Sequence, residues 1–327
     1  MDLLRSKMPM PKIVLWAVLF LTTMLPAAIA APQDMVQPIG DIGLLAPPDP
    51  PGPGGPKFYS ETGPKPNWNI AQWNIPGGAL SPFQKNVSGD TTTYTASASE
   101  ARLKIIRHGN DVQVDLAQDG TVLPCETAAG RPRESDFLLS PNGQHANFPG
   151  VPGLTIQGDA KMPLSRLSSV VFEAGLSVTE GITQQRKGCP VDQGSALLGV
   201  ILTNFTKSHA QTMFYQLNFD QLCGIQPQAR DKLCHAVHDK PLYFFRTNPF
   251  GVADFLPLLG MSFVHSQEQR QLDLDILPRL RIIVQNGPVG MDRDLSHWTV
   301  TGLYVGQAIW GDVTLASQWR NIHLLVE

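Results

Sequence analysis

The sequence predicts an all-β fold, an antiparallel β-sandwich or jelly roll with one short helix and long loops. Segments in which apolar and polar residues alternate recur along most of the chain, which is the pattern of half-buried strands. Glycine and proline number 29 and 28 among 327 residues, so turns should be frequent. Charged residues make up only 16% and the net charge is −3, which excludes a coiled coil and gives no positive field for nucleic acid.

Residues 1–30 are typical of a cleaved export signal. Basic residues precede the apolar run 13–25, and the small-residue pattern Ala28-Ile29-Ala30 follows it. The run is too short to cross a bilayer comfortably, because a spanning helix needs about 20 residues. The sequence therefore predicts a secreted or periplasmic protein without a stable membrane span, with an uncleaved anchor as the alternative.

The segment 31–66 is predicted to be a Pro/Gly-rich linker. Its densest part, residues 47–56, has few backbone donors and few apolar side chains, so it should stay extended and solvated. The folded part is then expected to be a single β-sandwich domain over residues 67–327.

Four cysteines follow the export signal, and an even number in an exported chain predicts two disulfides. The pairing Cys223 with Cys234 is favoured because it closes a compact loop, and it leaves Cys125 with Cys189. The other connectivities stay open. No Cys-x-x-Cys pair indicates a zinc site.

Strands are predicted wherever period-two alternation is clear. The runs are 91–98, 103–107, 112–116, 169–179, 197–205, 212–219, 242–246, 271–276, 281–284, 298–305 and 313–326, of which the last could be two strands. Residues 108–111 should form the turn of a hairpin. A helix is expected from Pro227 to just before Pro241. The stretch 123–166 either borders a binding cleft or holds two or three short strands.

Several enzyme classes have no support in the motifs. The chain lacks a P-loop, a Gly-x-Gly-x-x-Gly fingerprint, a His-Glu-x-x-His pair and a Gly-x-Ser-x-Gly elbow. Nucleotide chemistry, thermolysin-type proteolysis and lipase-type hydrolysis are therefore not indicated.

Aromatic residues lie close to amides and carboxylates, which suits a sugar-binding surface. Sugar C–H faces pack on aromatic rings, and Asn, Gln and Asp side chains bond to hydroxyls. The candidates for carbohydrate binding are Trp68, Trp73, Trp298, Tyr304 and Trp310. The alternative for each tryptophan is a place in the sandwich core.

Carboxylates on predicted strands are candidates for catalysis, because glycosidases use a pair of them. They are Glu173, Glu180, Asp273 and Asp275, with Tyr304 or His297 as the base if the chemistry is that of a lyase. A solvated strand face is the alternative. No resident cofactor is predicted; a calcium ion at Asp292-Arg293-Asp294 is the alternative to a turn or helix cap there.

The run Tyr304-Val305-Gly306-Gln307-Ala308-Ile309-Trp310-Gly311, followed by Asn321-Ile322-His323-Leu324, resembles the last part of small jelly-roll endoglucanases and concanavalin A-like sandwiches. The resemblance covers about twenty residues. It implies a catalytic Glu where this chain has Ala308, and a second Glu on a strand where Gln216 is the nearest polar residue. The resemblance thus favours binding over the glucanase mechanism.

The leading functional hypothesis is an exported protein that recognises a polysaccharide or another glycan. The second is an enzyme that cleaves a polysaccharide by hydrolysis or elimination. The third is a non-catalytic envelope or matrix protein that meets another protein.

Overall fold

The computed structural model describes residues 31–46, 57–63, 66–123, 134–141, 162–183, 193–204, 206, 211–223, 242–244, 251–256 and 266–327. From Pro32 onward these residues belong to one compact unit. The export signal, the helix expected from Pro227, and Cys125, Cys189 and Cys234 lie outside the described residues. The signal and both disulfides therefore stay predictions.

One sheet has eight strands. They are β1 (Gln33–Asp34), β5 (Gln84–Ser88), β6 (Thr91–Ser97), β7 (Ala101–His108), β8 (Asp111–Asp119), β10 (Val170–Thr183), β15 (Ser266–Asp275) and β17 (Val313–Val326). They lie in the order β15, β10, β17, β8, β7, β6 and β5, and β1 pairs with the C-terminal end of β17. All of these pairs are antiparallel.

The other sheet has nine strands. They are β2 (Ile42–Ala46), β3 (Lys57–Glu61), β4 (Trp68–Trp73), β9 (Glu134–Pro141), β11 (Gln193–Asn204), β12 (Gln211–Cys223), β13 (Leu242–Phe244), β14 (Gly251–Leu256) and β16 (Trp298–Trp310). Their order is β13, β14, β12, β11, β16, β9, β4, β2 and β3. Two neighbouring pairs, β12 with β14 and β2 with β4, are parallel.

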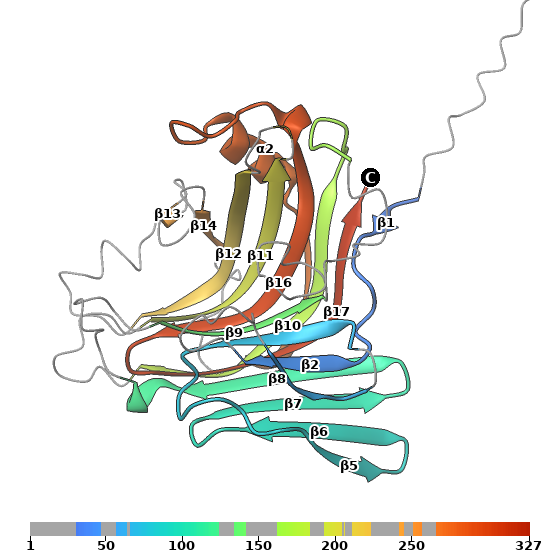
Figure 1. Cartoon of the computed structure of the whole chain (residues 1–327), viewed down its shortest axis with the longest axis vertical. Helices are drawn as coiled ribbons and strands as arrows, with labels where there is room; N and C mark the ends of the chain where they lie inside the picture. Colours follow the sequence, from blue (N-terminus) through green and yellow to red (C-terminus); the bar gives the residue numbers. More distant parts are fainter. Residues whose placement is uncertain are drawn as a thin grey trace, which may run out of the picture. The chain divides into compact units, whose positions relative to one another are not determined.

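The two sheets enclose the hydrophobic core, as the alternation of the strands requires. Phe172 of β10 and Trp319 of β17 come from the eight-stranded sheet, and both pack on Phe219 of β12 from the nine-stranded sheet. The ring centroids lie 6.3 Å apart in each pair. The jelly-roll β-sandwich predicted from the sequence is thus confirmed (Figure 1).

A buried polar network also joins the two sheets. The amide nitrogen of Gln307 on β16 donates to Gln118 Oε1 of β8 at 2.9 Å, and Ser317 Oγ of β17 donates to Gln307 Oε1 at 2.7 Å. Gln118 donates to Ser135 Oγ at 2.7 Å, and the Trp319 indole donates to Ser317 Oγ at 3.2 Å. These bonds satisfy polar groups that would be costly to bury alone, and they fix how the sheets face each other.

Most predicted strands are present. All of the runs predicted as strands from the sequence, except 281–284, correspond to strands of the structure. These strands are β6, β7, β8, β10, β11, β12, β13, β15, β16 and β17. His108 pairs with Asp111, which closes the predicted hairpin. The run 313–326 is one strand, with an irregular register against β10.

The predicted strand 281–284 is instead part of the helix α2 (Leu277–Gln285). Pro278 stands in its first turn, and Leu277, Leu280 and Ile283 are buried along one side at helical spacing. Four residues are too few to separate the two periodicities, so the short apolar run was misleading.

The predicted linker also differs from the structure. Residues 31–46 and 57–63 supply β1, β2 and β3, and the folded unit starts well before Asn67. Ile42 and Leu44 are fully buried, because β2 pairs with β4 in the nine-stranded sheet. The dense proline segment 47–56 lies outside the described residues.

Within the part of the chain that the structure describes, no helix has the length and apolar character needed to cross a membrane.

Candidate functional site

The nine-stranded sheet has a face directed away from the core, which we call the outer face. Strands β12, β11 and β16 bend strongly, and the hollow side of the bend faces away from β10 and β17 (Figure 1). The outer face carries a second apolar cluster, separate from the core. It consists of Leu197, Ile201, Tyr304 and Ala308, with Leu138, Phe214 and Trp310 packed against it.

A β-bulge in β16 brings Tyr304 to this face. Ile201 pairs with Gly302 and Leu202 pairs with Val300, so Thr301 is an extra residue in β16. An extra residue reverses the alternation of side chains that follow it. Val300 therefore lies in the core, whereas Tyr304 lies on the outer face.

Gly199 of β11 makes room for the Tyr304 ring. The two residues are direct partners across the β11–β16 ladder. A Cβ atom at Gly199 would overlap the phenol ring, so only glycine allows the ring to lie flat against the neighbouring strand. Tyr304 is consequently 7% exposed although it belongs to an outer surface.

Amide side chains of β12 lie next to Tyr304 and add polar groups beside the apolar cluster. The Tyr304 hydroxyl donates to Gln216 Oε1 at 3.3 Å, and Gln216 Nε2 donates to Asn218 Oδ1 at 3.0 Å. This chain of bonds holds the amides in fixed orientations beside an aromatic ring.

Two carboxylates reach the same face from β9. Asp136 pairs with Ala308 and Glu134 pairs with Trp310 across the β9–β16 ladder. Burial raises the pKa of Tyr304, and the negative charges of Asp136 and Glu134 raise it further. The phenol therefore stays protonated and keeps its role as a hydrogen-bond donor.

The adjacent strand β4 adds Asn69 and Trp73. Trp68 and Ile70 point into the core, so Asn69 and Trp73 point outward by alternation. Trp73 is half-buried and pairs with Asp136. Asn69 is only 2% exposed, and its Oδ1 has no hydrogen-bond partner. A buried amide oxygen without a donor is costly, and this atom is closed off from solvent.

The predicted aromatic set divides between the two sides of the sheet. Trp73, Tyr304 and Trp310 occupy the outer face. Trp68 and Trp298 do not, because both are fully buried in the core. Their indole nitrogens donate to the backbone oxygens of Gln37 and Asp292. The assignment of Trp68 and Trp298 to sugar binding is corrected accordingly.

The predicted catalytic carboxylates lie on the other sheet. Glu173 and Asp273 are direct partners across β10 and β15. Asp275 accepts hydrogen bonds from the Val170 and Leu277 backbones at 3.1 Å each, which holds the start of α2. Glu180 lies at an irregularity of β10. The structure brings none of these four residues to the outer face.

The loop suggested for calcium is tied by internal hydrogen bonds. The backbone N–H of Asp294 donates to the Asp292 carboxylate. The side chains of His297 and Asn204 also bond to this carboxylate, at 2.8 and 3.0 Å. These bonds lower the pKa of Asp292 to about 2. Asp294 in turn accepts from the Ser296 backbone, as an N-cap. Among the described residues, no group of three or more His, Cys, Asp or Glu side chains is placed to hold a metal ion.

Glu134 and Asp136 are not among the site residues predicted from the sequence. Both lie in the stretch 123–166, which proline and glycine dominate. The apolar run Phe137-Leu138-Leu139 between polar residues is the signal that could have indicated β9.

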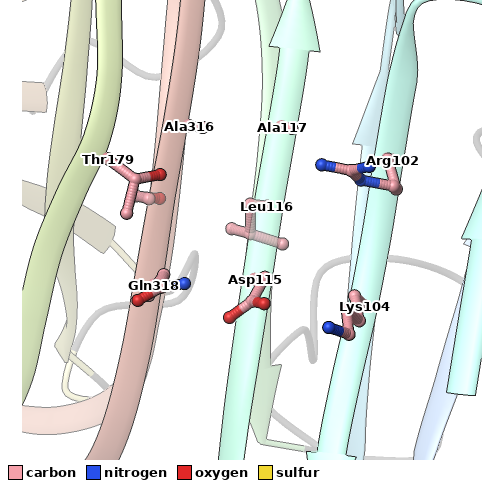
Figure 2. A pocket seen from close by; sticks show the side chains of 9 residues that line it. Arg102, Lys104, Asp115, Leu116, Ala117, Thr179, Ala316 and Gln318 are labelled. Carbon is pink, nitrogen blue, oxygen red and sulfur yellow. The ribbon is translucent and has the colours of Figure 1, made fainter. Parts of the chain in front are cut away.

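The outer side of the eight-stranded sheet has a shallow depression of about 170 Å³. Figure 2 shows Arg102 and Lys104 of β7 on one side, Asp115 of β8 in the middle, and Thr179 and Gln318 on the other side. Burial raises the pKa of Asp115, against the opposing effects of its bond to Gln113 and of the nearby cations. Charges of both signs therefore meet here, and few apolar groups are available for a ligand.

Comparison with known proteins shows similarity of architecture. No protein-family model matches the chain, and no curated protein matches it in sequence. Among solved structures, the xyloglucanase domain of NopAA from Sinorhizobium fredii is 8% identical, over 76% of this chain and 98% of that one, with a TM-score of 0.37. A family 12 xyloglucanase from Bacillus licheniformis is 9% identical, over 77% and 100%, with a TM-score of 0.39.

The family 11 xylanase from Neocallimastix patriciarum is 6% identical, over 78% of this chain and 100% of that one, with a TM-score of 0.38. Sequence identities and TM-scores this low describe a similar arrangement of strands and nothing more. The side chains of the outer face must therefore be judged on their own chemistry.

Proposed function

We propose that the outer face of the nine-stranded sheet binds a polysaccharide. The observation that carries this proposal is the second apolar cluster, in which Tyr304 and Trp310 lie on a sheet face outside the core. A sandwich needs one apolar face per sheet, so this cluster on the opposite face is additional to the core.

The chemistry of the surrounding residues supports a sugar ligand. An aromatic ring offers a flat apolar surface to the C–H groups of a sugar, and the Gln216 and Asn218 amides offer donors and acceptors to its hydroxyls. Glu134 and Asp136 add acceptors from the neighbouring strand. An extended chain of sugars can use several such positions along a bent sheet.

A binding experiment with Trp310→Ala tests the proposal. The purified protein should be mixed with a panel of soluble polysaccharides, and the affinities measured by calorimetry. Loss of the indole should reduce the affinity for the bound polysaccharide about tenfold, which corresponds to about 1.4 kcal/mol. Tyr94→Ala is the matched control, because Tyr94 is a half-buried aromatic residue on β6 of the other sheet.

Two results would contradict the proposal. One is the absence of binding to every polysaccharide tested. The other is equal loss of affinity in the Trp310 and Tyr94 variants, which would reflect general destabilisation. A protein partner recovered by crosslinking, with no glycan affinity, would favour an envelope or matrix role instead.

Cleavage is the second candidate function, and one observation favours it. Asp136 lies beside Ala308, the position at which the resemblance to endoglucanases implies a catalytic Glu. A carboxylate thus reaches this part of the face from the neighbouring strand, and Glu134 lies two residues away. Release of reducing ends from a bound polysaccharide, abolished in Asp136→Asn, would establish hydrolysis; binding without release would leave recognition as the function.

A further inference from the structure

The depression on the eight-stranded sheet has a floor of two short side chains. Ala117 of β8 and Ala316 of β17 are direct partners across the antiparallel ladder, and both line the depression. Asp115 and Gln318 form the next pair on the same side of the sheet, and their longer side chains stand beside the alanines. The hollow of about 170 Å³ therefore follows from the residues of these two strands.

An irregularity of β10 supplies one wall. Val178 pairs with Ser317 and Glu180 pairs with Ala316, so Thr179 is an extra residue opposite β17. Val178 belongs to the core, and Thr179 therefore points to the outer side of the sheet. Its side chain lies across the alanine floor from β7 (Figure 2).

Strand β7 supplies the opposite wall with two cations. Arg102 pairs with Ala117, and Lys104 pairs with Asp115 across the β7–β8 ladder. Among the described residues, the Arg102 guanidinium and the Lys104 ammonium group make no hydrogen bond or salt bridge, and both act on Asp115 through charge. Their N–H groups are thus available to a ligand.

Neighbouring amides and hydroxyls hold the groups between these walls. The Gln113 amide donates to Asp115 Oδ1, and Gln113 in turn accepts from Arg320 Nε at 2.6 Å. Ser177 Oγ donates to Gln318 Oε1 at 3.1 Å. These bonds leave Asp115 Oδ2 as an acceptor and Gln318 Nε2 as a donor for a ligand.

The lining is rich in donors and carries more positive than negative charge. Two cations line the depression against one carboxylate, and the Glu180 carboxylate is not part of the lining. The polar side chains of the lining are half-buried or exposed, so a ligand can reach them. A ligand that fits must therefore offer a negatively charged acceptor group together with hydroxyls for Asp115, Thr179 and Gln318.

The size of the depression limits the ligand to a small unit. Pockets for drug-sized ligands usually have about 300–1,000 Å³, which is more than this depression offers. A single sugar ring with one charged substituent has the required combination of small size, hydroxyl groups and an oxyanion.

From these observations we propose that the depression binds one sugar unit that carries an oxyanion, either a carboxylate or a sulfate group. The oxyanion accepts hydrogen bonds from Arg102 and Lys104, and the ring hydroxyls bond to Asp115, Thr179 and Gln318. This site belongs to the other sheet and is independent of the polysaccharide binding proposed above.

The test uses small probes, which occupy one unit of space. Galacturonate, galactose 6-sulfate and galactose should be titrated into the wild-type protein and followed by NMR. At least one of the two acidic sugars should bind with a dissociation constant in the millimolar range, because exposed charge pairs are weak. Galactose, acetate and inorganic sulfate should each bind at least tenfold more weakly, since each lacks either the oxyanion or the ring.

The double variant Arg102→Gln/Lys104→Gln tests the cations. Its affinity for the acidic sugar should fall at least tenfold. The matched control is Lys85→Gln/Arg166→Gln, which changes the net charge by the same amount at exposed residues outside the depression. This control should keep the wild-type affinity. An unchanged melting temperature shows that each variant is folded.

The variant Ala117→Leu tests the location without any change of charge. A larger side chain on the floor fills the space that the ring would occupy, so the affinity should again fall at least tenfold. Trp310→Ala should leave the binding of the acidic sugar unchanged, because Trp310 belongs to the outer face of the other sheet.

The results distinguish this site from the proposed function. Failure of both acidic sugars to bind would overturn the inference and would leave polysaccharide binding on the outer face in place. Equal losses in the two double variants would also overturn it, because net charge alone would then hold the ligand. Binding of acetate or inorganic sulfate as tight as that of the acidic sugar would show that the ring is not recognised, which contradicts the inference as well.

Discussion

At the scale of single residues, the outer face depends on side chains that have little room to move. The Tyr304 ring occupies the space above Gly199, and its hydroxyl bonds to Gln216. The ring thus has one position in which it can contribute to a flat platform. Its neighbours, rather than its own sequence position, determine that orientation.

Gly199→Ala should displace the Tyr304 ring, because the added methyl group overlaps it. We expect polysaccharide affinity to fall about tenfold, with a loss of folding stability of about 1–3 kcal/mol from overpacking. Calorimetry and urea denaturation measure the two effects. Gln84→Ala, at an exposed position of β5, provides a stability control. Unchanged affinity in Gly199→Ala would show that the ring position is unimportant.

Asp292 should make the protein sensitive to acid. Its pKa of about 2 in the folded state lies below the ordinary value of 3.8, so its contribution to stability is complete above about pH 4 and is lost as the pH falls through about 2. Asp292→Asn should reduce the free energy of unfolding at neutral pH by about 1–3 kcal/mol.

Denaturant titrations between about pH 2 and pH 7 measure this effect. The difference between wild type and Asp292→Asn should shrink toward the acid end. Asp90→Asn, at an exposed turn, is the control. A difference that stays constant with pH would show that the carboxylate charge does not contribute.

At the scale of elements, the sequence predicts strands well where alternation is long and regular. The hairpin of β7 and β8 was found because Leu103, Ile105, Val112 and Val114 alternate with polar residues on either side of a turn. Strand β9 was missed since its flanks are rich in proline and glycine. Short runs such as 281–284 fit a helix and a strand equally.

The candidate site was only partly predictable for the same reason. Trp298 and Tyr304 are six positions apart, and regular alternation places them on one face. The extra residue Thr301 separates them, so one lies in the core and the other on the outer face. A bulge depends on the partner strand, which a single strand's sequence does not reveal.

At the scale of the whole molecule, we expect the buried polar network between the two sheets to stabilise their packing. Gln307→Leu keeps the volume nearly constant but leaves Gln118 Oε1, the Ser317 hydroxyl and the Leu315 carbonyl without their partner. We expect a loss of about 2–4 kcal/mol in the free energy of unfolding, because buried polar groups would be unsatisfied.

Urea denaturation measures this loss. Gln271→Leu is the matched control, since Gln271 is exposed on β15 and its change should stay within about 0.5 kcal/mol. Equal stabilities of the two variants would mean that the network adds nothing beyond packing.

The extra residue in β16 has a consequence for how relatives of this chain would be compared. Inserting or removing one residue near Thr301 would exchange interior and exterior side chains along the rest of the strand. Positions that align in two sequences would then point in opposite directions in two proteins of the same architecture. The side chains on the outer face can therefore differ between two such proteins after the insertion or removal of one residue, with few substitutions.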